Sequence, residues 1–176
     1  MPSMIFNYAG TFVVGGAVAL FIFAIVRTFK LAAPRWIYPA SIGVAMMSFQ
    51  VYNDYTWFDR AAADLPPTHV VAGSFTRADP LRFWTLLVEP VDRFSVVDRT
   101  SLKRNPKIDE FVIGDVLLVT RFQPTVRVTQ VFDCSGNRRG DVHAEVTFDA
   151  SGRPMGVDWV TLPADNPMMV AACRRA

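Results

Sequence analysis

The chain has 176 residues, of which 51% are hydrophobic and 19% are charged, and its formal net charge is +2. This composition excludes a disordered chain, and the length is too short for two large domains. Residues 1–53 hold three bases and no acid, whereas residues 54–176 hold the other 15 bases and all 16 acids. The second part is therefore nearly neutral and lacks the basic surface that nucleic acid binding requires.

Residues 5–26 form the first apolar segment, in which Asn7 and Thr11 are the mildly polar members. A bilayer core about 30 Å thick needs roughly 20 such residues in a helix, so this segment is predicted to span a membrane. A cleaved signal peptide is the main alternative, because it is also an N-terminal apolar run. We favour the span, since no lysine or arginine precedes the segment and the run is longer than a signal core.

Residues 36–52 form a second, shorter apolar segment that contains Pro39 and Gln50. A proline in the first helical turn costs little, so residues 1–53 are predicted to form a transmembrane helical hairpin. The linker 27–35 carries three bases and no acid, which places it in the cytoplasm by the positive-inside rule. Both ends of the chain then face the periplasm, if the bilayer is the inner membrane of a Gram-negative bacterium.

Small residues recur at helical spacing in both segments and would let helix backbones approach closely in lipid. These membrane-packing candidates are Gly15, Gly16, Ala19, Ser41 and Ala45. They would pack the hairpin against itself or dock it against a larger integral membrane protein. Neither segment contains Asp, Glu, Lys, Arg or His, which argues against a transporter or channel. No cofactor is predicted, although a lipid or pigment beside the spans would leave no motif.

Residues 54–67 are rich in alanine and proline towards their end and are predicted to be a stiff connector. Residues 68–176 are then one small α+β domain, built mainly from an antiparallel sheet with a C-terminal helix. Helices are predicted at 80–88 and at 166–173, where Pro167 suits a first turn. The predicted strands are residues 70–75, 93–97, 112–122, 125–132, 142–148 and 154–160.

Cys134 and Cys173 are the two cysteines of the chain, and both lie in the part predicted to be periplasmic. An even number of cysteines in an oxidising compartment predicts a disulfide, which would pin the C-terminal helix onto the sheet. The alternative is a redox-active or nucleophilic Cys134. The sequence disfavours it, because it has no C-x-x-C motif and no histidine close to this cysteine.

The last part of the domain carries a recognisable order of residues. They are Asp133, Cys134, Arg138, Arg139, Phe148, Gly152, Trp159, Pro163 and Cys173. This pattern resembles the surface-adhesin protein E family, and the resemblance implies a small exported antiparallel sheet whose last helix is tethered by the two cysteines. The chain has predicted spans where that family has a lipoprotein signal, which argues against adhesion to a host surface.

Residues 81–93 combine aromatic and aliphatic side chains and permit two interpretations. We favour a core helix; the alternative is a segment that lies along the membrane surface or against a partner. Aromatic side chains dominate binding hot spots, so four of them are candidate partner contacts. They are Trp57, Phe58, Phe83 and Trp84.

No catalytic motif is found, and two histidines 74 residues apart cannot supply a cluster of metal ligands. We therefore expect a non-catalytic accessory subunit of a larger photosynthetic, respiratory or secretion complex of the inner membrane. Its spans would pack against partner helices, and its domain would cover the periplasmic face. The alternative is a membrane-anchored periplasmic binding module, of adhesin-like type, for a peptide, lipid or protein ligand.

Overall fold

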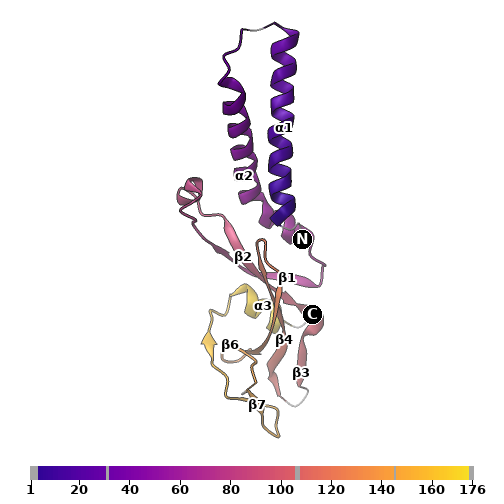
Figure 1. Ribbon diagram of the computed structural model, residues 1–176. Helices are drawn as coiled ribbons and strands as arrows, with labels where there is room; N and C mark the ends of the chain where they lie inside the picture. The colour runs from indigo at the N-terminus through magenta and orange to yellow at the C-terminus, as the bar shows by residue number, and fades with distance from the viewer. Residues whose placement is uncertain (1–3, 31, 106–107, 145, 175–176) are drawn as a thin grey trace.

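A computed structural model describes residues 4–30, 32–105, 108–144 and 146–174, with two long helices standing on a curled sheet (Figure 1). Helix α1 covers Met4–Thr28 and helix α2 covers Ile37–Ala63. The helices are antiparallel, so the start of α1 and the sheet lie at the same end of the hairpin (Figure 1). Among the described residues, Tyr8–Thr28 is the one helix long and apolar enough to cross a membrane, a test that a signal sequence also passes.

Helix α2 differs from the prediction because it continues without a break from the second apolar segment to Ala63. The segment that we predicted to be a stiff connector is therefore helical over residues 54–63, and only its last residues link helix to sheet. Alanine is the strongest helix former, which explains the continuation through residues 61–63. Two prolines follow at 66 and 67, and a helix cannot continue through them.

Seven strands of the described chain form one antiparallel sheet in the order β1-β2-β4-β5-β6-β9, and β3 pairs with β4 beside this path. The strands are β1 (His69–Thr76), β2 (Val91–Asp98), β3 (Lys103–Asn105), β4 (Ile108–Thr120), β5 (Val126–Asp133), β6 (Arg138–Asp141) and β9 (Val160–Thr161). A separate hairpin pairs β7 (Thr147–Phe148) with β8 (Pro154–Met155). The other helical elements are the 3₁₀ turns η1 (Phe83–Leu86) and η2 (Arg99–Ser101) and helix α3 (Pro167–Cys173).

The antiparallel sheet, its first four predicted strands and the C-terminal helix are confirmed. The predicted hairpin 142–148/154–160 is wrong in extent, because only two residues pair on each side. Both residues of β7 are exposed, so the burial of side chains does not stabilise a longer pair of strands there. The polar strand β6 was not predicted, since its sequence Arg-Arg-Gly-Asp lacks the alternating apolar pattern that marks a strand.

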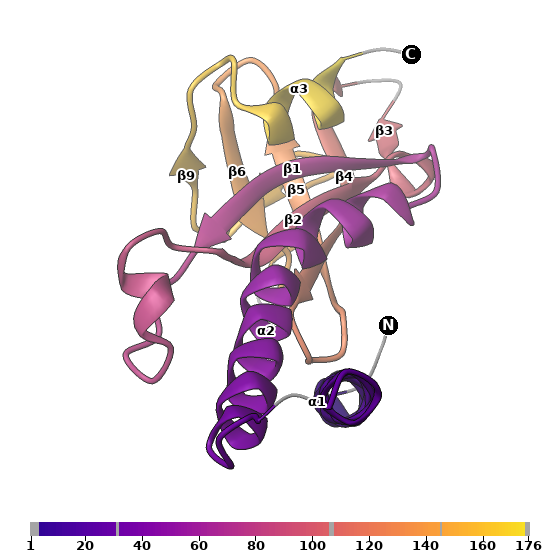
Figure 2. The ribbon, with the colours of Figure 1, turned by 90° about the horizontal axis from the view of Figure 1, so that it is seen from above.

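The sheet separates two apolar clusters, because neighbouring strand residues such as Val96 and Val97 point to opposite faces. Helix α3 covers one face and the last turns of α2 cover the other (Figure 2). The first cluster includes Val97, Val112, Val116, Phe132, Met168, Met169, Ala171 and Ala172. The second includes Phe94, Val96 and Val119, with Trp57, Phe58, Ala61 and Leu65 packed against them.

The predicted disulfide is confirmed, and it joins Cys134, directly after β5, to Cys173 at the end of α3, with their Cα atoms 5.6 Å apart. At the other end of α3, the Asn166 side chain accepts a hydrogen bond from the Met168 amide at 3.0 Å. Pro167 occupies the first turn, where its missing N–H has no cost. The helix is thus capped at its start, bonded covalently at its end, and buried along the sheet between them.

Asp133 organises the turn beside this disulfide and is 2% exposed. Its carboxylate accepts hydrogen bonds from the amides of Ser135 and Gly136 at 3.1 and 2.9 Å and from Arg138 Nε at 2.7 Å. The Arg138 guanidinium also stacks 4.7 Å from the centre of the Trp159 ring. Burial raises the pKa of Asp133, but the hydrogen bonds from Gly136, Ser135 and Arg138 outweigh it and hold the pKa below its usual value.

Candidate functional site

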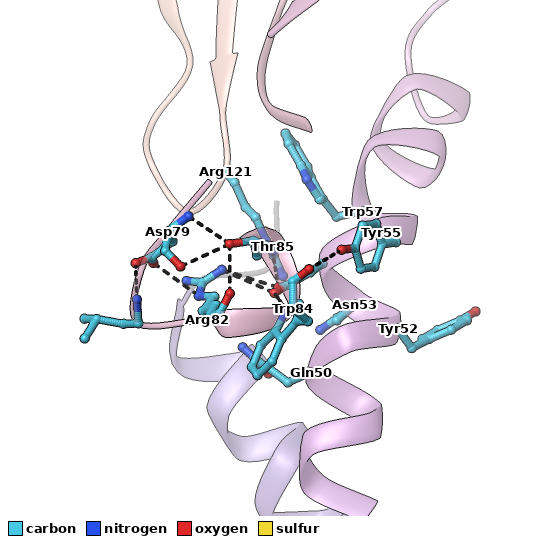
Figure 3. Close-up of polar contacts among 12 residues, drawn as sticks. Gln50, Tyr52, Asn53, Tyr55, Trp57, Asp79, Arg82, Trp84, Thr85 and Arg121 are labelled. Carbon is cyan, nitrogen blue, oxygen red and sulfur yellow. Dashed lines mark hydrogen bonds and ion pairs between the residues drawn. The ribbon is translucent and has the colours of Figure 1, made fainter. Parts of the chain in front are cut away.

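Asp54 is the centre of a buried ionic cluster where α2 meets the sheet, and it is 1% exposed. Its carboxylate pairs with Arg121, which follows β4, and lies 3.4 Å from Arg82 Nη1. The Trp84 indole donates a third hydrogen bond to Asp54 Oδ2 at 2.9 Å. Figure 3 shows Arg82, Trp84 and Arg121 converging beside α2 from two separate segments of the domain. A carboxylate on the helix therefore joins three chain segments.

The charge of Asp54 is compensated by two arginines, of which Arg121 is the more deeply buried. Burial lowers the pKa of Arg121, and the hydrogen bond and charge of Asp54 act in the opposite direction. Arginine stays protonated even so, because its ordinary pKa lies far above neutral pH. The Arg121 guanidinium also stacks 4.6 Å from the centre of the Phe122 ring. The cluster is consequently a paired and hydrogen-bonded set of charges, the form in which buried charges are tolerated.

The loop that carries Arg82 and Trp84 is fastened to α2 by a second contact. The Tyr55 hydroxyl lies 2.7 Å from the Val88 carbonyl oxygen and 3.2 Å from that of Trp84. Inside the loop, the buried Thr85 hydroxyl accepts a hydrogen bond from the Asp79 amide at 2.8 Å and lies 2.8 Å from the Arg82 carbonyl oxygen. These contacts fix the loop against consecutive residues of the helix (Figure 3).

The four predicted partner-contact aromatics occupy different environments. Trp57 and Phe58 are half-buried and pack on Phe94, with ring centres 5.8 and 5.2 Å away. Trp84 is half-buried and bonded to Asp54, so these three residues join helix to domain inside the protein. Phe83 is exposed and lies edge-on to Trp84. Of the four, only Phe83 presents most of its ring to the surroundings.

The small residues of the hairpin also divide into two groups. Gly15 is buried, and a Cβ placed on it would lie 3.1 Å from Met46 of α2, so this glycine packs the hairpin against itself. Gly16 is exposed, and a Cβ there would meet nothing within 4 Å. The other three predicted packing residues are half-buried; they are Ala19, Ser41 and Ala45.

A pocket of about 270 Å³ opens beside the Asp54 cluster. Its charged lining comes from Arg77, Asp79, Arg82, Asp92 and Arg121. The lining thus holds three bases and two acids, and no group of three or more His, Cys, Asp or Glu side chains within the described ranges could hold a metal ion. The arrangement fixes the helix and the sheet in one orientation, and it contains no serine or cysteine nucleophile.

The sequence analysis missed Asp54, Arg82 and Arg121 as a group. Asp54 is the first acid after 53 residues without one, and aromatic residues follow it directly. That position at the end of an apolar helix is a usable signal for a buried anchor point. Its arginine partners are 28 and 67 residues away in the chain, and no local pattern points to them.

Comparison with known proteins adds no relative: no family model, no curated protein and no solved structure matches this chain.

Proposed function

We propose that the chain is a non-catalytic accessory subunit of a larger inner-membrane complex, anchored by the α1–α2 hairpin and holding its sheet domain over the periplasmic face. The observation that carries the proposal is the Asp54 cluster. It ties the domain to the same continuous helix that leaves the apolar hairpin, so the domain has a fixed orientation relative to the anchor. A domain that moved freely on a flexible tether would not need these buried ionic contacts with the helix.

The proposed topology has both α1 and α2 crossing the membrane. The end of α1 and the start of α2 lie away from the sheet (Figure 1). Arg27 is in the last turn of α1 and Arg35 directly precedes α2, as expected for a cytoplasmic linker. The disulfide favours an oxidising compartment for the domain at the opposite end. An alkaline phosphatase fused after the last residue should be active, and activity of a cytoplasmic reporter there would overturn this topology.

The exposed Gly16 on α1 supplies a test of docking against partner helices. In lipid, small residues on a free helix face let another helix approach closely, whereas the neighbouring Gly15 already packs on α2. We expect Gly16→Leu to remove a stoichiometric companion from the protein purified in mild detergent. Ala17→Leu, at an exposed position one residue further along α1, is the matched control and should retain it. A protein that purifies alone in the unaltered form contradicts the subunit proposal.

A membrane-anchored binding module is the second candidate, and the pocket beside the Asp54 cluster favours it. Arg77 is exposed in this lining and carries none of the contacts that hold α2 to the sheet, so Arg77→Ala should fold normally. We expect an acidic peptide that uses the pocket to raise the thermal midpoint of the unaltered protein and not that of the variant. Equal shifts in both proteins would argue against this pocket.

A further inference from the structure

The loop of residues 81–88, which contains η1, exposes five apolar side chains. The exposed fractions are 92% for Leu81, 59% for Phe83, 60% for Leu86, 85% for Leu87 and 62% for Val88. The core helix that the sequence favoured here is wrong, because the helical part is a short 3₁₀ turn whose Phe83 and Leu86 side chains are exposed. Single exposed apolar residues are normal in proteins, but five within eight residues mark a contact surface.

The position of this loop along the hairpin indicates what it contacts. Gly10 of α1 packs beside Phe49 of α2, so in an antiparallel pair Asp54 and Tyr55 lie level with the first turns of α1. The loop is bonded to these same two residues of α2 through Trp84 and Val88. It therefore lies at the height where the apolar surface of α1 begins, and Figure 1 shows it rising beside the lower turns of α2.

Aromatic side chains of both helices extend the apolar loop at the same level. Tyr8 of α1 is 54% exposed and Tyr52 of α2 is 61% exposed. Tyrosine and tryptophan collect where the hydrocarbon core of a bilayer meets water. The loop is displaced sideways from both helices when the molecule is viewed from above (Figure 2). Its apolar side chains therefore add a separate area of contact at the level of these two tyrosines.

The loop is also prepared for an apolar environment, because several of its backbone amides have hydrogen-bond partners within the protein. The amides of Thr85, Leu87 and Val88 donate to carbonyl oxygens within the loop. The Leu81 amide donates to Asp79 Oδ1 at 3.0 Å, and Arg82 is paired with Asp54 and Asp79. Backbone groups that lack partners make insertion into lipid costly, and these groups already have them.

We infer that the 81–88 loop inserts its apolar side chains into the periplasmic leaflet of the bilayer, at the boundary between headgroups and acyl chains. The loop acts as a second, monotopic contact beside the hairpin, and together they prevent the domain from tilting on the membrane. Amphipathic elements of this kind bury their apolar side roughly 5–10 Å into that boundary. The inference rests on α1 crossing the membrane as proposed above.

The test uses the full chain in vesicles of phosphatidylethanolamine and phosphatidylglycerol, with one nitroxide label on an introduced cysteine. Labelling without reductant preserves the native disulfide. Leu87→Cys and Leu81→Cys report on the loop, and Phe12→Cys, exposed on α1, reports on the span. Met155→Cys is the matched control, because Met155 is an exposed apolar residue in the hairpin at the far end of the domain (Figure 1).

The measured quantity is the rate at which each label collides with oxygen, which concentrates in lipid, and with a nickel chelate, which stays in water. The oxygen-to-nickel ratio at Leu87 and Leu81 should be several-fold above that at Met155 and below that at Phe12. Ratios at both loop positions equal to that at Met155, with a high ratio at Phe12, overturn the loop inference and leave the anchor intact. A low ratio at Phe12 overturns the anchor itself. Loop labels shielded from both reagents indicate a protein contact instead of lipid and also overturn the inference.

Discussion

The two faces of the sheet are held in different ways. On the α3 face, the cover is a short apolar helix that packs on the sheet and has one covalent bond at its end. On the α2 face, three aromatic or aliphatic side chains of the helix cover the cluster around Phe94, and a buried carboxylate with two arginines and an indole belongs to the same face. The α3 face completes the domain by itself. The α2 face joins the domain to the helical hairpin and requires a defined orientation, which directional hydrogen bonds supply and apolar contacts alone do not.

The largest loss of stability is expected from Asp54→Ala, which disrupts the α2 face alone. The substitution leaves the guanidinium of Arg121 buried without its carboxylate, and removing one partner of a buried ion pair costs about 3–5 kcal/mol of unfolding free energy. Denaturant unfolding in detergent micelles measures it. Asp59→Ala, exposed on the same helix, is the matched control and should change stability little. The double substitution Asp54→Leu with Arg121→Met should recover stability, and equal losses in the single and double variants would contradict the ion-pair explanation.

The corresponding disruption of the other face is Cys134→Ser with Cys173→Ser. The bond closes a loop with a sequence separation of 39, for which the chain-entropy estimate is about 4 kcal/mol. We expect the loss to appear as a lower denaturant midpoint and to match that of the unaltered protein under reducing conditions. The Asp54 contacts should persist in the folded variant, because none of them involves α3 or the disulfide. A stability unchanged by reduction would contradict the role of the disulfide.

A smaller effect is expected from Asp133→Asn, because a neutral amide keeps the shape of the turn but weakens the bond to Arg138. The cost should be about 1–3 kcal/mol at neutral pH. The folded pKa of Asp133 lies below its usual value of 3.8, so its contribution is present above that pH and is lost as the pH falls below it. The variant should therefore lose less stability on acidification than the unaltered protein. Identical acid profiles of the two proteins would contradict this assignment.

The smallest expected effect distinguishes the adjacent glycines of α1. A Cβ on Gly15 would press on the flexible Met46 side chain, whereas one on Gly16 would meet open space. Gly15→Ala should thus be less stable than Gly16→Ala by about 1 kcal/mol, since both gain the same helix propensity. Thermal unfolding followed by circular dichroism compares them. The reverse order would show that Gly15 does not lie in the helix interface.

Some features of this chain depended on local sequence and were predictable from it. Local patterns of apolar residues, which repeat along a helix or a strand, are sufficient to predict several elements. These are helix α1, strands β1, β2, β4 and β5, and helix α3. The disulfide followed from the number of cysteines and the expected compartment. Extended pairing after β6 was overpredicted, because turn residues at 149–152 predict a hairpin but do not ensure that its strands are buried.

By itself, the sequence determined the order of the main helices and strands, the apolar first helix and the cysteines available for pairing, since these depend on periodicity and composition. The tertiary structure alone brought Arg82 and Arg121 to Asp54 and turned the 81–88 loop outwards. The physical reason is the range of the interactions. Propensity and alternation act between neighbours along the chain, whereas the compensation of a buried charge involves residues 28 and 67 positions apart, and only the folded chain brings them together.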